Sequence, residues 1–345
     1  MDLSGGVLDL STWQGVLLAG VAVLAALALA NAALARRAER KHPPTGAFVE
    51  VDGVRLHYSD RGSGTPVVLL HGNAVTGGDY NTSGVAERLL GRSCRVVVFD
   101  RPGFGHSDRP RGRAWTAEQQ ADLLHEALAL LDVRRPVVVG HSWGTLVALA
   151  FAVRHPADTA GLVLLSGYYF PTPRLDALMV APVAMPVLGD VLRYTVSPVF
   201  GWLNMPLLKR AMFAPSDVTD RFKAEYSSAM ALRPSQIRAT AMDGTLMVPG
   251  AAGLSPHYGG LSMPVAIVAG DGDLVVGKSQ AERLNGAVPG SSLEIVEGAG
   301  HMVHHVATDR VVEAIAAVAE ASGGAASPER PAAPRAEADA APPQR

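Results

Sequence analysis

The chain has 345 residues, enough for one large domain with appended segments, and its formal net charge of −2 gives no electrostatic basis for binding nucleic acid. Its single cysteine, Cys94, excludes an intrachain disulfide and a cysteine-rich metal site, and we expect it to be a small core residue. The 11 histidines show none of the spacings typical of zinc sites, so the sequence predicts no bound metal.

An apolar run over residues 15–35, interrupted only by Asn31, follows an N-terminal segment of residues 1–14. As a helix, a run of about 21 residues measures about 31 Å, which is enough to cross the hydrocarbon core of a bilayer. A cleaved signal peptide is the alternative, because Ala-x-Ala patterns follow the run. The first segment, however, contains Asp2 and Asp9 and no basic side chain. The sequence therefore predicts an uncleaved transmembrane anchor.

Basic residues follow the run instead, in a linker predicted over residues 36–46: Arg36, Arg37, Arg40 and Lys41. Positive charge beside a membrane span favours the cytoplasmic side, so we expect a single-pass protein with a cytoplasmic catalytic domain. Trp13 is placed to anchor the other interface.

The globular part alternates strand and helix patterns. A hairpin is predicted over residues 47–58, turning at Asp52-Gly53. Strand patterns follow near 66–70, 95–99, 136–140, 162–166, 264–269 and 292–296. Helical patterns lie near 116–132, 142–154, 277–287 and 303–321. The alternation predicts an α/β core, over residues 47–167 and 263–321, built on a mostly parallel sheet flanked by helices.

The most informative motif joins the 136–140 strand to the 142–154 helix: Gly140-His141-Ser142-Trp143-Gly144. G-x-S-x-G at a strand-to-helix turn is typical of a nucleophile elbow, in which a strained turn lifts the serine above the sheet edge. The pentapeptide alone is weak evidence for a nucleophile elbow, but the strand before it and the helix after it supply the expected context. Ser142 is therefore the predicted nucleophile.

A serine nucleophile needs a base and an acid that orients the base. Asp271 and Asp273 follow the 264–269 strand, and His301 follows the 292–296 strand. Sites in open parallel sheets lie at these carboxyl strand ends. We assign Asp273 as the acid and His301 as the base. Asp271 is the alternative acid, and His304 and His305 are expected to face solvent from the next helix.

Acyl transfer also needs two backbone N–H donors for the oxyanion. One is expected from Trp143, directly after the nucleophile. The other is expected from the loop that follows His71-Gly72, either from Asn73 or from Ala74. We interpret His71 itself as a structural brace of that loop.

Together these motifs resemble the α/β-hydrolase superfamily, in the branch of cap-bearing serine hydrolases, over residues 47–320. The segment from Val98 to Ser107 adds to the resemblance, because it is similar to the Asp-x-Arg-Gly-x-Gly-x-Ser turn of that family, with Pro102 where arginine is frequent. Dehalogenase and epoxide hydrolase relatives have an aspartate nucleophile, so Ser142 argues against both activities.

Residues 168–262 interrupt the alternation, and their length and helical character predict an inserted helical lid, or cap. Seven of the ten methionines fall in it: Met179, Met185, Met205, Met212, Met230, Met242 and Met247. We expect most of them to pack the lid onto the core and some to line an apolar substrate pocket. A third interpretation of these methionines is that the lid contacts the membrane. The tail, residues 322–345, is rich in Ala, Pro and charge and is predicted to be disordered.

The predicted function is hydrolysis of a carboxylic ester, or a related acyl bond, of a small apolar substrate through a Ser-Asp-His triad and an acyl-enzyme, without a cofactor. Two alternatives use the same residues. The acyl-enzyme could react with something other than water, as in an acyltransferase or perhydrolase. The chain could also be a low-turnover ligand-binding protein with this fold.

Overall fold

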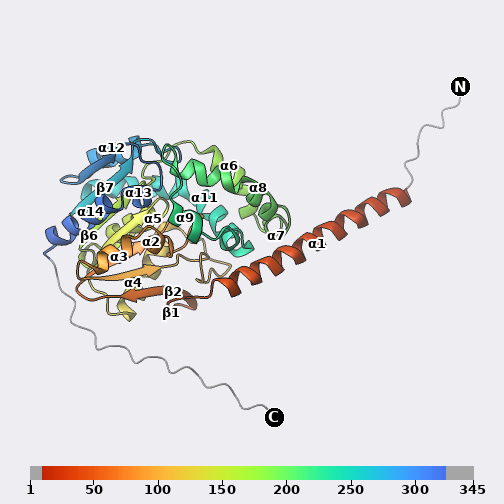
Figure 1. Ribbon diagram of the computed structural model, residues 1–345, viewed down its shortest axis with the longest axis horizontal. Helices are drawn as coiled ribbons and strands as arrows, with labels where there is room; N and C mark the ends of the chain where they lie inside the picture. Colours follow the sequence, from red (N-terminus) through yellow and green to blue (C-terminus); the bar gives the residue numbers. More distant parts are fainter. Residues whose placement is uncertain (1–9, 324–345) are drawn as a thin grey trace, which may run out of the picture.

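The structure is a computed structural model that describes residues 10–323 (Figure 1). Residues 1–9 and the predicted disordered tail from residue 324 onward lie outside the described residues. A single sheet of eight strands forms the centre, in the order β1-β2-β4-β3-β5-β6-β7-β8. The strands are β1 Ala47–Val51, β2 Val54–Arg61, β3 Thr65–Leu70, β4 Cys94–Phe99, β5 Val137–His141, β6 Gly161–Leu165, β7 Val265–Gly270 and β8 Ser292–Val296.

The pairing confirms the predicted fold class. β1 and β2 form an antiparallel hairpin, and β2 also pairs antiparallel with β4. All remaining neighbours are parallel. The hairpin turns at Asp52 and Gly53, both with positive φ, as a two-residue turn that continues the strand twist requires.

Helices cover both faces of the sheet, and this explains why its inner strands are continuous β-branched and aliphatic runs. One face packs against α4 (Ala117–Leu130), α5 (Gly144–Arg154) and α12 (Ser279–Ala287). The other packs against α3 (Val85–Leu90) and α14 (Thr308–Ala321). Cys94 is buried in this second layer, as predicted.

Two details differ from the expected elements. The short helices α2 (Asp79–Thr82) and α3 were not predicted, because neither is long enough to show a helical period. The helix expected over 303–321 is broken at Ala307 into α13 (Val303–Val306) and α14.

The segment between β6 and β7 is helical, and we call it the helical insertion. Its elements are α6 Leu175–Ala184, α7 Leu188–Tyr194, α8 Val196–Phe213, α9 Asp220–Glu225, α10 Ser228–Ala231, α11 Pro234–Leu254 and the 3-10 helix η2 Ser255–Gly260. Met205, Met212, Met230 and Met247 are buried in it, whereas Met179 and Met185 are exposed.

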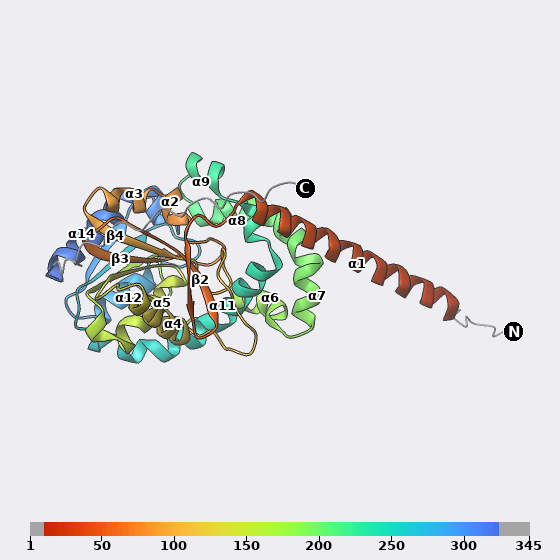
Figure 2. The ribbon, with the colours of Figure 1, turned by 90° about the horizontal axis from the view of Figure 1, so that it is seen from below.

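The N-terminal helix α1 (Leu10–Lys41) projects far beyond the domain (Figures 1 and 2). Its segment Trp13–Lys41 is long and apolar enough to cross a membrane, a property that signal sequences share. The predicted linker is helical as far as Lys41. Near its C-terminal end α1 packs on the helical insertion, where Asn31 donates hydrogen bonds to the carbonyls of Tyr194 and Thr195, both at 2.9 Å.

Candidate active site

Ser142 lies in the turn between β5 and α5, with φ of +52°, in the left-handed region that a nucleophile elbow requires. The turn is tight enough to demand both flanking glycines. A Cβ on Gly140 would lie 2.6 Å from the carbonyl oxygen of Gly144, and one on Gly144 would lie 2.4 Å from that of Leu70. The sequence pattern and the local backbone therefore agree at this turn.

The structure brings Asp273 and His301 together from the ends of β7 and β8. His301 Nδ1 lies 2.8 Å from Asp273 Oδ2, and both side chains are buried. The other carboxylate oxygen accepts the backbone N–H groups of Val275 and Val276, both at 2.8 Å, so the carboxylate is fixed on two sides. Asp271, the alternative acid, instead accepts the N–H of Gly298 in the neighbouring turn.

No hydrogen bond joins the Ser142 hydroxyl to His301 within residues 10–323. The neighbouring His141 side chain donates from Nε2 to the backbone carbonyl of His301 at 3.1 Å, which joins the elbow to the His301 loop. Because Asp273 occupies Nδ1 of His301, Nε2 is the atom left to receive a serine proton. Catalytic hydrogen bonds are often long without substrate and shorten in the substrate complex.

The loop expected to supply the second oxyanion donor lies against the nucleophile, since a Cβ on Gly72 would come within 2.9 Å of Ser142 Cβ. Ala74 in this loop has φ of +64°. Trp143 is the N-cap of α5, whose first N–H groups have no acceptor within the helix. The three expected donors therefore lie on two segments that meet at Ser142.

Arg101 holds this loop from behind. Its side chain donates to the carbonyls of His71 and Gly72 and to Oδ1 of Asn73, at 2.8, 3.3 and 2.8 Å. His71 accepts the N–H of Arg101 at Nε2 and donates from Nδ1 to the carbonyl of Gly72. Burial, with the nearby Arg101 cation, lowers the pKa of His71 to about 4. His71 is thus a neutral brace of the loop.

The helical insertion reaches the site through Asp243 on α11. Its carboxylate pairs with Arg101 at 2.7 Å and Arg109 at 2.8 Å, and its carbonyl accepts the indole N–H of Trp143. Tyr226 adds a contact by donating to the carbonyl of Ala74 at 3.0 Å. No sequence motif marks Asp243 or Tyr226, because their partners come from other segments of the chain.

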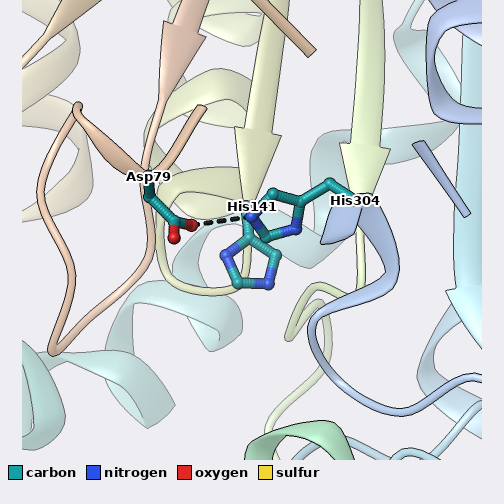
Figure 3. A group of neighbouring side chains, drawn as sticks. All are labelled: Asp79, His141 and His304. Atoms are coloured by element: carbon teal, nitrogen blue, oxygen red, sulfur yellow. Dashed lines mark hydrogen bonds and ion pairs between the residues drawn. The ribbon is translucent and has the colours of Figure 1, made fainter. Parts of the chain in front are cut away.

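Asp79, His141, His304 and His305 form a buried histidine cluster beside the elbow, and Figure 3 shows the first three of them. Asp79 accepts Nε2–H of His304 at 2.7 Å and of His305 at 2.8 Å. The His304 ring lies 4.3 Å from that of His141, and the His141 ring lies 5.0 Å from that of His301. The prediction that His304 and His305 face solvent is therefore wrong, since α13 packs them inward against α2.

Charge in this cluster is settled by burial and hydrogen bonding. Burial alone raises the pKa of the Asp79 carboxyl, but His305 and His304 hold it well below its usual value. Burial lowers the pKa of His304 and, most strongly, that of His141. Burial thus keeps the imidazoles of His141 and His304 neutral beside the Asp79 carboxylate.

Asp79, His141 and His304 also offer ligand atoms within 4.8 Å of one another, so this group could hold a metal ion. Both oxygens of Asp79 already accept an imidazole N–H, however, and His141 already donates to His301. These bonds use Nε2 of His141 and of His304, whereas Nδ1 of both rings is buried without a hydrogen-bond partner in the described chain. The absence of a metal stays a prediction.

Replacing Asp79 by asparagine should lower the free energy of unfolding by about 2 kcal/mol, because an amide turns its NH₂ group toward one of two imidazole donors. Asp158→Asn is the matched control, since it breaks an exposed pair with His125 and should change stability little. Denaturant unfolding of both variants measures the difference. Equal losses would contradict the structural role of the cluster.

Acidification should destabilise the protein between pH 6.5 and 4. An unfolded chain protonates His71 below its ordinary pKa of 6.5, whereas the folded chain keeps it neutral until about pH 4. The contribution of His71 to the free energy of unfolding is therefore complete above pH 6.5. It is lost as the pH is lowered toward 4, by about 3 kcal/mol for this group. Unfolding curves at pH 7 and pH 4.5 measure the loss, and His71→Gln should flatten it. Equal midpoints at both pH values would refute the assignment.

The sequence profile of the alpha/beta hydrolase fold family matches residues 65–308. The chain therefore belongs to the alpha/beta hydrolase fold family, as its motifs and sheet topology indicated.

Two proteins are similar to this chain in sequence, and a third is similar in structure. An uncharacterized protein of Mycobacterium tuberculosis is 28% identical over 290 residues, which cover 79% of this chain and 80% of the relative. A 2-hydroxymuconate semialdehyde hydrolase of a Pseudomonas species is 32% identical over 144 residues, 41% of this chain and 51% of the relative. The solved structure of a bacterial membrane phospholipase A aligns with 92% of this chain and 97% of the phospholipase chain. The TM-score is 0.62 and the identity is 21%, so the similarity is one of fold. The two of these three proteins that have a stated activity are hydrolases.

Proposed function

We propose that this protein is a membrane-anchored serine hydrolase that cleaves a carboxylic ester, or a related acyl bond, of a small apolar substrate. The observation that carries the proposal is the buried Asp273–His301 pair, joined at 2.8 Å, at the same sheet edge as the left-handed turn of Ser142. A histidine held at Nδ1 by a carboxylate is oriented to accept a serine proton at Nε2.

The reaction proceeds in two steps. His301 takes the Ser142 proton as the hydroxyl oxygen attacks the substrate carbonyl, and the N–H of Trp143 with that of Asn73 or Ala74 stabilises the oxyanion. His301 then protonates the leaving alcohol, which leaves the acyl group on Ser142. Water, deprotonated by His301, releases the acid and restores the serine. Asp273 holds the ring and stabilises its charged form.

Two contacts join the candidate site to the segment between β6 and β7. The helical insertion, which we propose as the lid over residues 168–262, contacts the elbow through Trp143 and the oxyanion loop through Tyr226. Met230 and Tyr226 line a cavity of about 190 Å³ that reaches Ala74, but most of its lining residues are polar and Ser142 is not part of it. The fold likeness to a membrane phospholipase A supports an ester substrate.

Active-site labelling tests the proposal. A fluorophosphonate should modify the full-length chain once, at Ser142, and p-nitrophenyl esters of increasing acyl length should be turned over, with a preference for apolar chains. Products carrying an added alcohol or peroxide in place of water would assign an acyltransferase or perhydrolase. Labelling without turnover of any ester would indicate a low-turnover binding protein.

We further propose that α1 is an uncleaved anchor and that the catalytic domain is cytoplasmic, with Arg36, Arg37 and Arg40 on the cytoplasmic side. Contacts with the domain support retention of the helix. Asn31 bonds to the helical insertion, Ala38 is buried, and Glu39 pairs with Arg233 at 2.9 Å. A cleaved signal peptide would remove the first of these contacts.

The anchor has a direct test. The full chain should stay with membranes after carbonate extraction and keep its N-terminus, and protease added outside sealed cells should spare the domain. Deletion of residues 1–26, which removes the part of α1 whose described side chains are all exposed, should preserve activity. Deletion of residues 1–41 should cost stability, since it also removes the Glu39 pair. An N-terminus beginning near residues 31–36 would instead establish a cleaved, exported enzyme.

A further inference from the structure

The helical insertion carries an exposed apolar face. Six large side chains on α6, α8 and the turn before α7 keep 64% to 77% of their surface exposed: Leu175, Met179, Val187, Phe200, Leu203 and Leu207. We call these six residues the apolar face. Soluble proteins seldom expose such a concentration of large apolar side chains unless it meets a partner or a membrane.

The apolar face lies on the side of the domain from which α1 projects. Figures 1 and 2 both show α6, α7 and α8 at the end of the domain beside α1. The contact is specific, because the Asn31 amide donates to the two carbonyls at the junction of α7 and α8. The face is therefore continuous with the proposed membrane span.

The position of this contact along α1 determines how deep the α7–α8 junction lies in the membrane. Asn31 lies four residues before the end of the apolar run at residue 35, or about 6 Å along a helix. If residues 15–35 span the hydrocarbon core, the α7–α8 junction meets α1 inside the hydrocarbon edge. The domain cannot then stand clear of the bilayer on a linker.

We propose that the apolar face docks into the interfacial layer of the leaflet nearest the domain, so that the enzyme draws its ester from the bilayer. The inference rests on the proposed anchor and deepens the proposed function. Burial of the face removes exposed apolar surface from water. The bonds to the insertion also satisfy the one polar side chain of the run, which hydrocarbon would otherwise leave unpaired.

Charge next to the face agrees with this placement. Arg36, Arg37 and Arg40 follow the run directly and are all exposed, at the level where a leaflet presents its headgroups. A second copy of the chain is the competing occupant of the face. The bilayer is favoured because the depth of the Asn31 contact places the face at the membrane edge even in a monomer.

Probe depth in vesicles tests the docking. In full-length protein with Cys94→Ser, a fluorescent thiol probe is placed through Leu203→Cys or Leu207→Cys on α8. Leu130→Cys is the matched control, an exposed leucine at the end of α4, which lies away from α1 in both views. Each protein is reconstituted into phosphatidylcholine and phosphatidylglycerol vesicles with nitroxide-labelled acyl chains. Hydrolysis of a soluble short-chain ester verifies that each variant is folded.

Emission from the Leu203 and Leu207 probes should be lost to nitroxides near the headgroup, whereas emission from the Leu130 probe should persist. Replacing Phe200, Leu203 and Leu207 together by serine should slow hydrolysis of an ester held in vesicles about tenfold relative to a soluble ester.

Three results would overturn the inference. A chain that floats with vesicles but shows no more quenching at Leu203 than at Leu130 would refute docking and leave the anchor intact. Disulfide cross-linking between two Leu203→Cys copies, with probes shielded from the nitroxides, would assign the face to a dimer. A chain that fails to float would refute the anchor and the docking together, while soluble-ester turnover would still report on the triad.

Discussion

Replacing Ser142 by alanine should reduce ester hydrolysis by at least about a thousandfold, because no other group at the elbow can form the acyl-enzyme. The substitution removes one oxygen atom and leaves the left-handed turn and its flanking glycines in place. The kcat of purified protein on a short-chain ester measures the loss, and fluorophosphonate labelling should disappear with it.

Ser166→Ala is a matched control for this experiment. Ser166 also follows a strand and has positive φ, but it is buried and its hydroxyl has no hydrogen-bond partner in the described chain. Its removal should leave the rate near that of the unmodified protein. A Ser142→Ala protein that keeps a comparable rate would show that the nucleophile lies elsewhere.

The sheet was predictable from the sequence because its strands are short apolar runs rich in valine and separated by turn residues. β7, for example, is Val-Ala-Ile-Val-Ala-Gly and is buried throughout. Parallel strands covered on both faces leave such unbroken apolar segments. The elements that the sequence missed, α2 and α3, are four and six residues long, too short for a helical period to emerge.

The candidate triad was predictable for a different reason. Ser142, Asp273 and His301 each follow a strand, and parallel strands bring their carboxyl ends to one edge however far apart they are in sequence. Local patterns therefore sufficed to place these residues near one another. The choice between Asp271 and Asp273 depended on turn geometry that no local pattern specifies.

The surroundings of the site could not be predicted, because they depend on long-range packing of polar side chains. Asp79 and His304 lie 225 positions apart, and His304 was interpreted as solvent-facing from its place on a helix. Asp243 meets Arg101 and Arg109 across more than 130 positions. The contact of Asn31 with the helical insertion could not be predicted for the same reason. The length and composition of an apolar run indicate a membrane span but do not indicate which segment packs against it.

Asp273→Asn should lower kcat by about a thousandfold or more, whereas Asp271→Asn should lower it little. Asp273 accepts Nδ1–H of His301 on one oxygen and two backbone N–H groups on the other. An asparagine keeps the backbone bonds with its carbonyl oxygen and then turns NH₂ toward His301. The ring must present Nδ1 as an acceptor, which places the proton on Nε2 and blocks removal of the serine proton.

Asp271 offers the matched comparison, because it follows the same strand and has one backbone partner, the N–H of Gly298 at 2.8 Å. An asparagine oxygen accepts that bond equally well. Measured kcat and KM on one ester, with thermal unfolding to verify both folds, separate the two aspartates. Loss of kcat at unchanged KM in Asp273→Asn alone identifies the acid, since the tautomer affects the transition state and not ground-state binding. The reverse ranking would move the acid to Asp271 and would require the His301 loop to rearrange when substrate binds.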